Sequence, residues 1–170
     1  MKSLLILLFT FFAIAPKSVH EFKIKTIDGK TLKLNKFKGK KLLIVNTASK
    51  CGYTPQYEEL EKLSQQYKGK LVVIGIPANN FNAQDPGSNL EIKEFCKKNY
   101  GVSFILGEKL SVKGEDTAAL FKYLTSLENP DFTGEIKWNF EKFLIDENGK
   151  LIHRFRSKVK PLSSELTKYL

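Results

Sequence analysis

Two stretches of this chain are continuously apolar over the length of a buried strand, residues 42–45 and 71–76. Runs without polar alternation are typical of strands that helices cover on both faces. The segment between them predicts a helix, with Thr54 at the N-cap and Pro55 at the first helical position. A strand, a helix and a strand in this order predict two parallel strands joined by a right-handed crossover.

Alternation of apolar and polar residues predicts two hairpins elsewhere in the chain. Residues 22–34 alternate about Asp28-Gly29, a dipeptide that suits a type I′ turn because both central residues of that turn need positive φ. Residues 142–146 and 151–155 flank an Asn-Gly turn in the same way. These segments add antiparallel strands, so the sheet is expected to be mixed.

Three further helices follow from local signals. Ser88 and Glu91 form a capping box that opens a helix to about Asn99, residues 118–127 have helical spacing, and Pro161 begins a last helix. The order is two strands, a strand–helix–strand unit, two helices, two strands and a helix. It predicts an α/β domain in which helices flank a central mixed β-sheet, with an N-terminal β-hairpin.

The 170 residues of the chain suffice for one domain with its own core, which we place at residues 20–170. Residues 1–15 resemble a signal peptide, in which Lys2 precedes an apolar run shorter than the roughly 20 residues that a bilayer span requires. Ala13 and Ala15 supply the small residues of a cleavage site. We therefore expect export, to a periplasm or to the outside of the cell.

Basic residues exceed acidic residues by 28 to 18, which gives a net charge of +10. The lysines are spread along the whole chain and lack zinc-finger spacing or an aromatic RNA-binding signature, so no nucleic-acid partner is expected. Weak contact with an anionic membrane surface fits this charge. Two cysteines exclude a disulfide-dense scaffold, and a hydrophobic share of 42% excludes a disordered chain.

Cys51 occupies the position best suited to chemistry. It follows the strand at residues 42–45 and precedes the helix that begins near Thr54. This is the carboxyl edge, where sheets with parallel strands place their sites. Positive partial charge at a helix N-terminus favours the thiolate, which is the nucleophilic form of cysteine. A small buried core cysteine is the alternative interpretation.

Cys96 shares a helix face with Ile92 and Phe95, so it is expected to be at least partly buried. Spacing alone leaves three interpretations open: core packing, a static disulfide with Cys51, and a cysteine that resolves an oxidised Cys51. His20 and His153 are the two histidines of the chain, and we expect no metal site at either.

Neutral hydrogen-bond donors lie in two further segments, at Gln84 and at the pair Trp138-Asn139. Amide and indole N–H groups around a sulfur stabilise its anion without acting as a proton source. A lone Trp-Asn pair is usually an aromatic anchor beside a loop asparagine, so spacing alone assigns this pair no function.

Longer motifs give these residues a common context. Residues 46–54 read NTASKCGYT, residues 84–89 read QDPGSN and residues 137–146 read KWNFEKFLID. Together they resemble the glutathione peroxidase family, and the resemblance runs in order from about Phe22 to Leu170. Several long motifs in the right order are more specific than any one of them.

The resemblance implies a thioredoxin-like fold and a role for each candidate. Cys51 matches the peroxidatic position, which holds selenocysteine in some relatives, so no selenium is expected here. Gln84, Trp138 and Asn139 match the other members of the catalytic tetrad. Cys96 matches the resolving cysteine of the members that take electrons from thioredoxin. The long loop that builds tetramers in some members is missing, which implies a monomer.

We therefore expect a peroxidase that reduces hydrogen peroxide and organic hydroperoxides, lipid hydroperoxides among them, with no cofactor beyond a thiol reductant as co-substrate. Cys51 becomes a sulfenic acid and Cys96 closes a disulfide with it. Thioredoxin or another dithiol, rather than glutathione, then reduces this disulfide. Formation of the disulfide is expected to need local opening of the helix at residues 91–98.

Two other functions compete with that of a peroxidase. A redox relay, which passes oxidation from peroxide to a client protein, needs the same reactive thiolate and is the alternative. A disulfide oxidoreductase of the thioredoxin type is disfavoured, because Thr54 stands where its second cysteine would be.

Overall fold

A five-stranded mixed sheet forms the centre of the computed structural model, which describes residues 16–170; the expected signal peptide, residues 1–15, lies outside the described residues. The strands follow the order β5-β4-β3-β6-β7. They are β3 (Lys41–Thr47), β4 (Leu71–Pro77), β5 (Ile105–Leu106), β6 (Lys142–Ile145) and β7 (Leu151–Phe155). β3, β4 and β5 are parallel, whereas β6 and β7 pair antiparallel, so the expected mixed sheet is confirmed.

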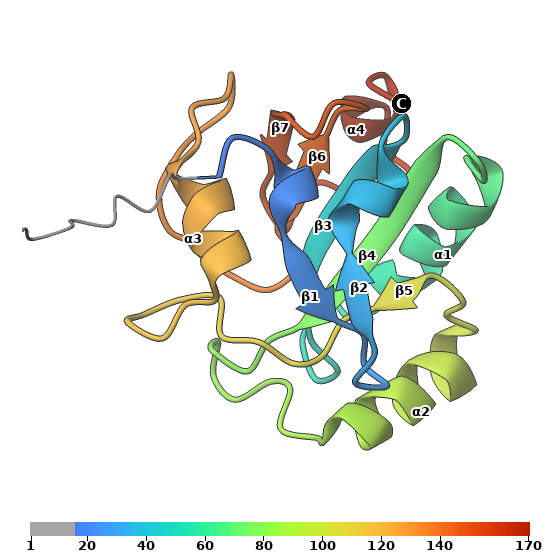
Figure 1. Cartoon of the computed structure of the whole chain (residues 1–170). Coiled ribbons are helices and arrows are strands. Elements are labelled where there is room, and N and C mark those ends of the chain that lie inside the picture. Colours follow the sequence, from blue (N-terminus) through green and yellow to red (C-terminus); the bar gives the residue numbers. More distant parts are fainter. Residues whose placement is uncertain (1–15) are drawn as a thin grey trace, which may run out of the picture.

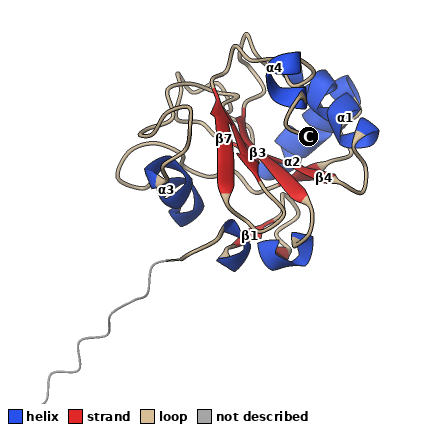
Figure 2. Ribbon diagram, turned by 90° about the horizontal axis from the view of Figure 1, so that it is seen from above, coloured by secondary structure: helices blue, strands red, loops and turns tan. Residues whose placement is uncertain are grey.

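Helices cover both faces of this sheet (Figure 2). One face carries α1 (Gln56–Gln66), α2 (Asn89–Tyr100) and the short α4 (Ser164–Thr167), whose buried residues belong to one core cluster. The other face carries α3 (Ala119–Ser126) and the N-terminal hairpin of β1 (Lys23–Lys25) and β2 (Thr31–Lys33) (Figure 1). Two short 3₁₀ helices, Val19–Glu21 and Leu34–Phe37, flank that hairpin.

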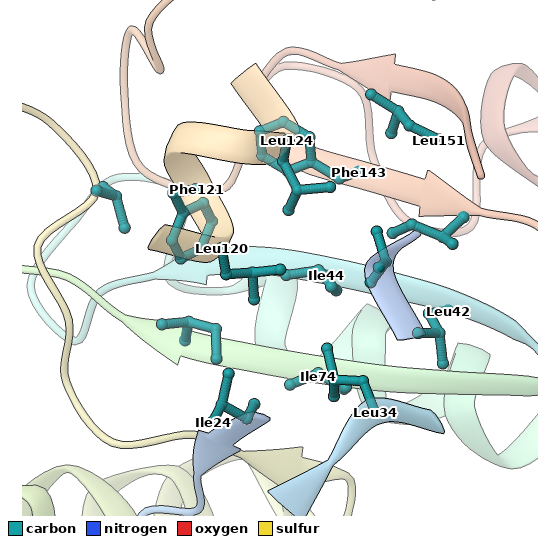
Figure 3. Packing of buried hydrophobic residues seen from close by; sticks show 14 of the residues in the cluster. Ile24, Leu34, Leu42, Ile44, Ile74, Leu120, Phe121, Leu124, Phe143 and Leu151 are labelled. Carbon is teal, nitrogen blue, oxygen red and sulfur yellow. The ribbon is translucent and has the colours of Figure 1, made fainter. Parts of the chain in front are cut away.

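Side chains of the central strand alternate between the two layers. Leu42 and Ile44 of β3 pack with α3 and the hairpin, as Figure 3 shows, while Leu43 and Val45 pack with α1 and α2. This follows from strand geometry, in which successive side chains point to opposite faces. All four side chains are fully buried, so a strand between two helical layers reads as the continuous apolar run seen in the sequence.

Both predicted hairpins are confirmed, but the turn of the first one differs from the expected type I′ turn. Within residues 26–30 only Gly29 has positive φ, at 76°, and its N–H donates to the Thr26 carbonyl at 2.8 Å. A type I turn followed by a left-handed glycine fits this pattern. The longer loop turns Ile27 into the core, and the Ile27 N–H donates to the Leu106 carbonyl at 2.8 Å.

The predicted helix starts are confirmed for α2 and wrong for α1. The hydroxyl of Ser88 accepts from the Glu91 N–H, and the Glu91 carboxylate accepts from the Ser88 N–H, so the capping box is present. α1 begins at Gln56 with Pro55 as its N-cap residue. Thr54 does not cap the helix, because its hydroxyl binds groups of the preceding loop instead.

The last helix is shorter than the sequence predicts. α4 begins at Ser164, three residues after Pro161, and the side chain of Leu162 stays 36% exposed. The Ser163 side chain donates to the Lys160 carbonyl at 2.7 Å, and its backbone N–H donates to the same carbonyl at 3.1 Å. Such side-chain bonds offer the backbone an alternative to the helix.

No helix within residues 16–170 combines the length and the apolar character needed to cross a bilayer.

Gly149 joins the second hairpin to the N-terminal segment. Its φ is 87°, its carbonyl accepts from the Val19 N–H at 2.9 Å, and an added Cβ would overlap the Ser18 hydroxyl and lie 2.8 Å from His20 Nδ1. Gly69 has a similar φ of 91°, yet nothing lies within 4 Å of its would-be Cβ. A side chain at Gly149 would therefore cause both backbone strain and steric overlap, whereas one at Gly69 would cause backbone strain alone.

We expect Gly149→Ala to lower the free energy of unfolding by about 2–4 kcal/mol, because left-handed strain and overpacking add. Gly69→Ala is the matched control and should lose about 1 kcal/mol from strain alone. Urea unfolding of both variants measures the difference. Equal losses would show that the N-terminal segment does not pack on this turn.

Candidate active site

The loop that carries Cys51 leaves the carboxyl end of β3 and is tied together by one threonine. The Thr54 hydroxyl accepts from the Cys51 N–H at 2.9 Å and donates to the Ala48 carbonyl at 3.0 Å. The Tyr53 N–H points at the Cys51 sulfur, with 3.5 Å between nitrogen and Sγ. Cys51 itself is partly exposed, so its sulfur meets a backbone donor and remains accessible.

A second loop leaves the neighbouring strand β4 and brings Gln84 beside the first. The Lys50 N–H donates to the Gln84 carbonyl at 2.9 Å, so the residue before Cys51 is bound directly to Gln84. Asn82 and Ala83 both adopt left-handed φ values, 51° and 49°. Two such residues in sequence are uncommon, and they turn the chain sharply just before Gln84.

Asp85 is the buried anchor between these two loops. Its Oδ1 accepts from the Ser49 N–H at 3.0 Å and from the Ser49 hydroxyl at 2.6 Å. Burial raises the pKa of the Asp85 carboxyl, while the bonds from Ser49 and the charge of Lys109 lower it in part. Oδ2 is buried and has no hydrogen-bond partner among the described residues.

A third segment, the turn between α3 and β6, contributes Trp138 and Asn139. Asn139 is fully buried, and its Nδ2 donates to Gln84 Oε1 at 3.0 Å. That bond uses the Gln84 oxygen and leaves the two N–H donors of the Gln84 amide for a ligand or a thiolate. The Trp138 ring packs on Phe81, with 5.6 Å between ring centroids.

Three of the four predicted catalytic residues, Gln84, Trp138 and Asn139, thus lie in segments that meet at the sheet edge that carries the fourth, Cys51. Gln84 is bound to Asn139 through its side chain and to the Cys51 loop through its backbone. A groove of about 390 Å³ opens beside them, between the two loops and α2. It is lined by Ser49, Lys50, Pro86, Gly87, Glu91, Ile92 and Phe95.

Cys96 lies inside the core, in the cluster of buried residues on which Cys51 packs. It sits in α2 with no exposed surface, and burial raises the pKa of its thiol to about 11. The Tyr57 hydroxyl faces the Cys96 thiol and the Thr47 hydroxyl, although it forms no hydrogen bond of regular geometry with either. Cys51 and Cys96 are both free thiols, so the expectation of a buried Cys96 holds without a static disulfide.

The two histidines serve other contacts. His20 packs against Gly149, and the His153 ring lies 3.1 Å from an Asp131 oxygen and stacks on Tyr169 at 3.7 Å between centroids. Across residues 16–170, no group of three or more His, Cys, Asp or Glu side chains is placed to hold a metal ion.

Several residues of the site escaped the sequence analysis. Asn46 donates from Nδ2 to the Trp138 carbonyl at 3.1 Å, and its carbonyl accepts from the Phe140 N–H at 2.6 Å. The Ser157 hydroxyl donates to the Asn139 carbonyl at 2.5 Å. Asn46 could have been found from the sequence, because it is a polar residue directly after the apolar run at residues 42–45. Ser157 carries no such signal, because its contacts arise only in the folded chain.

Comparison with known proteins places these motifs in a family. The family model described as "Glutathione peroxidase" matches residues 19–125. The "Glutathione peroxidase homolog BsaA" of Halalkalibacterium halodurans is 49% identical over 146 residues, which cover 85% of this chain and 93% of the relative. The "Glutathione peroxidase-like peroxiredoxin 2" of Saccharomyces cerevisiae is 48% identical over 149 residues, covering 86% and 91%.

Solved structures agree with the sequence matches. The crystal structure of T. cruzi GPX1 is 33% identical, with a TM-score of 0.68 over 90% of this chain and 93% of that one. The expected thioredoxin-like fold is thereby confirmed, together with its N-terminal hairpin.

Asp85→Asn keeps an acceptor for Ser49 and removes the carboxyl that titrates. The raised folded-state pKa of Asp85 means that its ionisation costs stability, and that stability is lost as pH rises through this pKa. The melting temperature of the variant, relative to that of wild type, should therefore increase as pH rises above about 4, the ordinary pKa of an aspartate. Asp116→Asn, at an exposed aspartate, controls for the lost charge. If the difference in melting temperature between Asp85→Asn and wild type does not vary with pH, burial does not raise the pKa of Asp85.

Proposed function

The chain belongs to the glutathione peroxidase family, and on that premise we propose that it is a thiol peroxidase with Cys51 as its peroxidatic residue. The bond between Asn139 and Gln84, with Gln84 bound to the loop of Cys51, is the observation that supports this most. Through these bonds the Gln84 loop and the turn of Trp138 and Asn139, two distant segments with neutral N–H donors, are attached to the loop that carries Cys51. Such donors stabilise negative charge on sulfur or oxygen without a full positive charge.

In the first step, the Cys51 thiolate attacks one oxygen of the peroxide. The O–O bond breaks, the sulfur becomes a sulfenic acid, and the second oxygen leaves as water or an alcohol once it is protonated. Charge moves from sulfur to the leaving oxygen during this step. Amide and indole donors from Gln84, Asn139 and Trp138 are suited to both positions, because they need no reorganisation as the charge moves.

In the second step, Cys96 resolves the sulfenic acid. Its sulfur bonds to Cys51 Sγ, the hydroxyl of the sulfenic acid leaves, and the proton of the Cys96 thiol completes a water molecule. An external dithiol then reduces the disulfide and is itself oxidised. We propose that α2 opens locally for this bond to form, and the deep burial of Cys96 in the reduced protein supports this.

The remaining expectations belong to the same proposal. We assign hydrogen peroxide and organic hydroperoxides as substrates and a thioredoxin-like dithiol as the reductant, in line with the yeast relative named a peroxiredoxin. The net charge of +10 favours weak contact with anionic membranes. We also propose that the protein is exported, on the pattern of residues 1–15, and that it acts as a monomer.

Peroxide consumption with thioredoxin and with glutathione, side by side, tests the function. We expect turnover with thioredoxin, none in Cys51→Ser, and a single oxidation without turnover in Cys96→Ser. Turnover in Cys51→Ser would reverse the roles of the cysteines. Rapid oxidation without turnover, together with one dominant mixed disulfide in Cys96→Ser, would favour the redox relay instead.

Removal of a single donor should slow the oxidation of Cys51 and leave the thiol in place. For Gln84→Ala and for Trp138→Phe we expect a loss of roughly 10- to 1000-fold in the rate constant, as is typical of a transition-state donor. Stopped-flow competition for hydrogen peroxide measures it. Gln66→Ala, at an exposed glutamine of α1, is the control for Gln84→Ala. Wild-type rates in both test variants would exclude these residues from the reaction.

Closure of the disulfide should leave a local signature in α2. Amide hydrogen exchange across residues 91–99 is expected to be faster in the oxidised protein than in the reduced one, because Cys96 must leave the core. Exchange in α1 should be similar in both forms and serves as the internal control. Equal protection of residues 91–99, with the disulfide confirmed by mass, would mean that the bond closes without local unfolding.

A further inference from the structure

Three consecutive carbonyls of the turn that carries Trp138 and Asn139 each accept from a buried side chain. Asn46 Nδ2 donates to the Trp138 carbonyl at 3.1 Å, and the Ser157 hydroxyl donates to the Asn139 carbonyl at 2.5 Å. Lys142 Nζ donates to the Phe140 carbonyl at 2.8 Å. Phe140 has a left-handed φ of 63°, a strained conformation that a non-glycine residue keeps only where the surrounding structure holds it.

Lys142 links this turn to the start of α1 through one acceptor. Its ammonium also donates to the Ser157 carbonyl at 3.3 Å, and that carbonyl accepts from Gln56 Nε2 at 2.7 Å. Gln56 is the first residue of α1, directly after the Cys51 loop. The ammonium thus sits between the segment that presents Asn139 and the segment that follows Cys51.

A lysine in this position is costly, because its side chain has no exposed surface. An ammonium buried in this way persists only where its donors are used and charges balance it in part. Glu59 of α1 and Glu141 of the turn supply that balance. Glu141 in turn is bound by Arg154 and Arg156, at 2.9 Å and 2.5 Å, so much of its charge is already compensated.

We propose that Lys142 is a positioning residue of the active site, whose buried ammonium holds the turn that presents Trp138 and Asn139 to Cys51. The proposal rests on the assigned roles of Cys51, Trp138 and Asn139. It adds a residue that does not touch the substrate and acts through the carbonyls of Phe140 and Ser157.

This placement also makes the turn sensitive to pH. Burial lowers the pKa of Lys142 to about 7, against the pull of Glu59 and Glu141. Above that pH the amine is neutral and keeps its N–H donors, but it loses the charge assistance that roughly doubles the strength of such bonds. The turn is therefore held firmly below about pH 7 and more loosely above it.

Trp138 is the sole tryptophan of the chain, so its fluorescence reports on this turn directly. The titration is run in a Cys51→Ser background, which removes the thiolate as a quencher. Emission should change with a midpoint near pH 7, and the transition should be absent when Lys142→Met is added. Lys137→Met, at an exposed lysine beside Trp138, is the matched control and should keep the transition.

A kinetic comparison with Cys51 intact completes the test. Lys142→Met should slow the oxidation of Cys51 by about 10- to 100-fold at pH 6, the effect of a displaced catalytic group. Its melting temperature should be unchanged or higher, because a buried charge has been removed. A transition and an oxidation rate that both survive in Lys142→Met would overturn the proposal.

Two further outcomes are decisive. If Lys142→Met does not fold, the titration is repeated with both histidines replaced by asparagine: a transition that persists supports Lys142, and one that vanishes assigns it to a histidine and refutes the proposal. Slow reaction of wild type with every peroxide would refute the proposed function, and the fluorescence titration would still decide the link between Lys142 and the turn.

Discussion

The parallel register of β3 and β4 ends with Thr47 opposite Pro77, so the chain leaves both strands at the same edge of the sheet. Because of that register the loops of Cys51 and Gln84 become neighbours, and the Lys50 N–H reaches the Gln84 carbonyl. The antiparallel partner β6 enters the same edge from the other side of β3 and brings the Trp138 turn with it. Three segments far apart in sequence meet because one strand, β3, has a different kind of partner on each side.

Buried polar groups then fix what the sheet has brought together. Five buried polar residues each bind a backbone group of a site loop: Asp85, Asn46, Ser157, Glu141 and Lys142. Arg154, which pairs with Glu141, also has no exposed side-chain surface. Such ionic groups seldom add net stability, since their desolvation offsets the attraction. Lys142 in particular destabilises the fold while it is charged, and this cost declines as pH rises from about 7 toward the ordinary lysine pKa of about 10.4. What these buried polar groups contribute to the structure is a single defined arrangement of the site loops.

Local rules were enough to predict β3, β4, both hairpins and the capping box of α2, because each depends on residues close together in sequence, but they missed the two-residue edge strand β5. Apolar runs report burial of β3 and β4, and Ser88 with Glu91 satisfies its own helix start. The same rules fail at Thr54, because its hydroxyl binds the Cys51 N–H and the Ala48 carbonyl of the preceding loop and not the N–H groups of the helix. They also miss Ser157 and Lys142, whose roles depend on carbonyls that only folding brings within reach. The candidates Gln84, Trp138 and Asn139 were found from long motifs and not from any single spacing.

The two cysteines lie in different surroundings, and the difference fits the two roles proposed for them. Cys51 is partly exposed in a loop held by the hydroxyl of Thr54 and by the bonds of Ser49 to Asp85, so the proposed peroxide substrate would meet a residue whose neighbours are already fixed. Cys96 is a neutral thiol held in the core of α2, where peroxide does not reach it. On the mechanism proposed above, oxidation falls on the partly exposed Cys51 first, and Cys96 joins it only after α2 opens. Buried polar bonds hold the loops of the site, whereas α2 is held mainly by the apolar contacts of Ile92 and Cys96. This difference suits the proposed mechanism, which needs a rigid site for the oxidation of Cys51 and a helix that can open for Cys96.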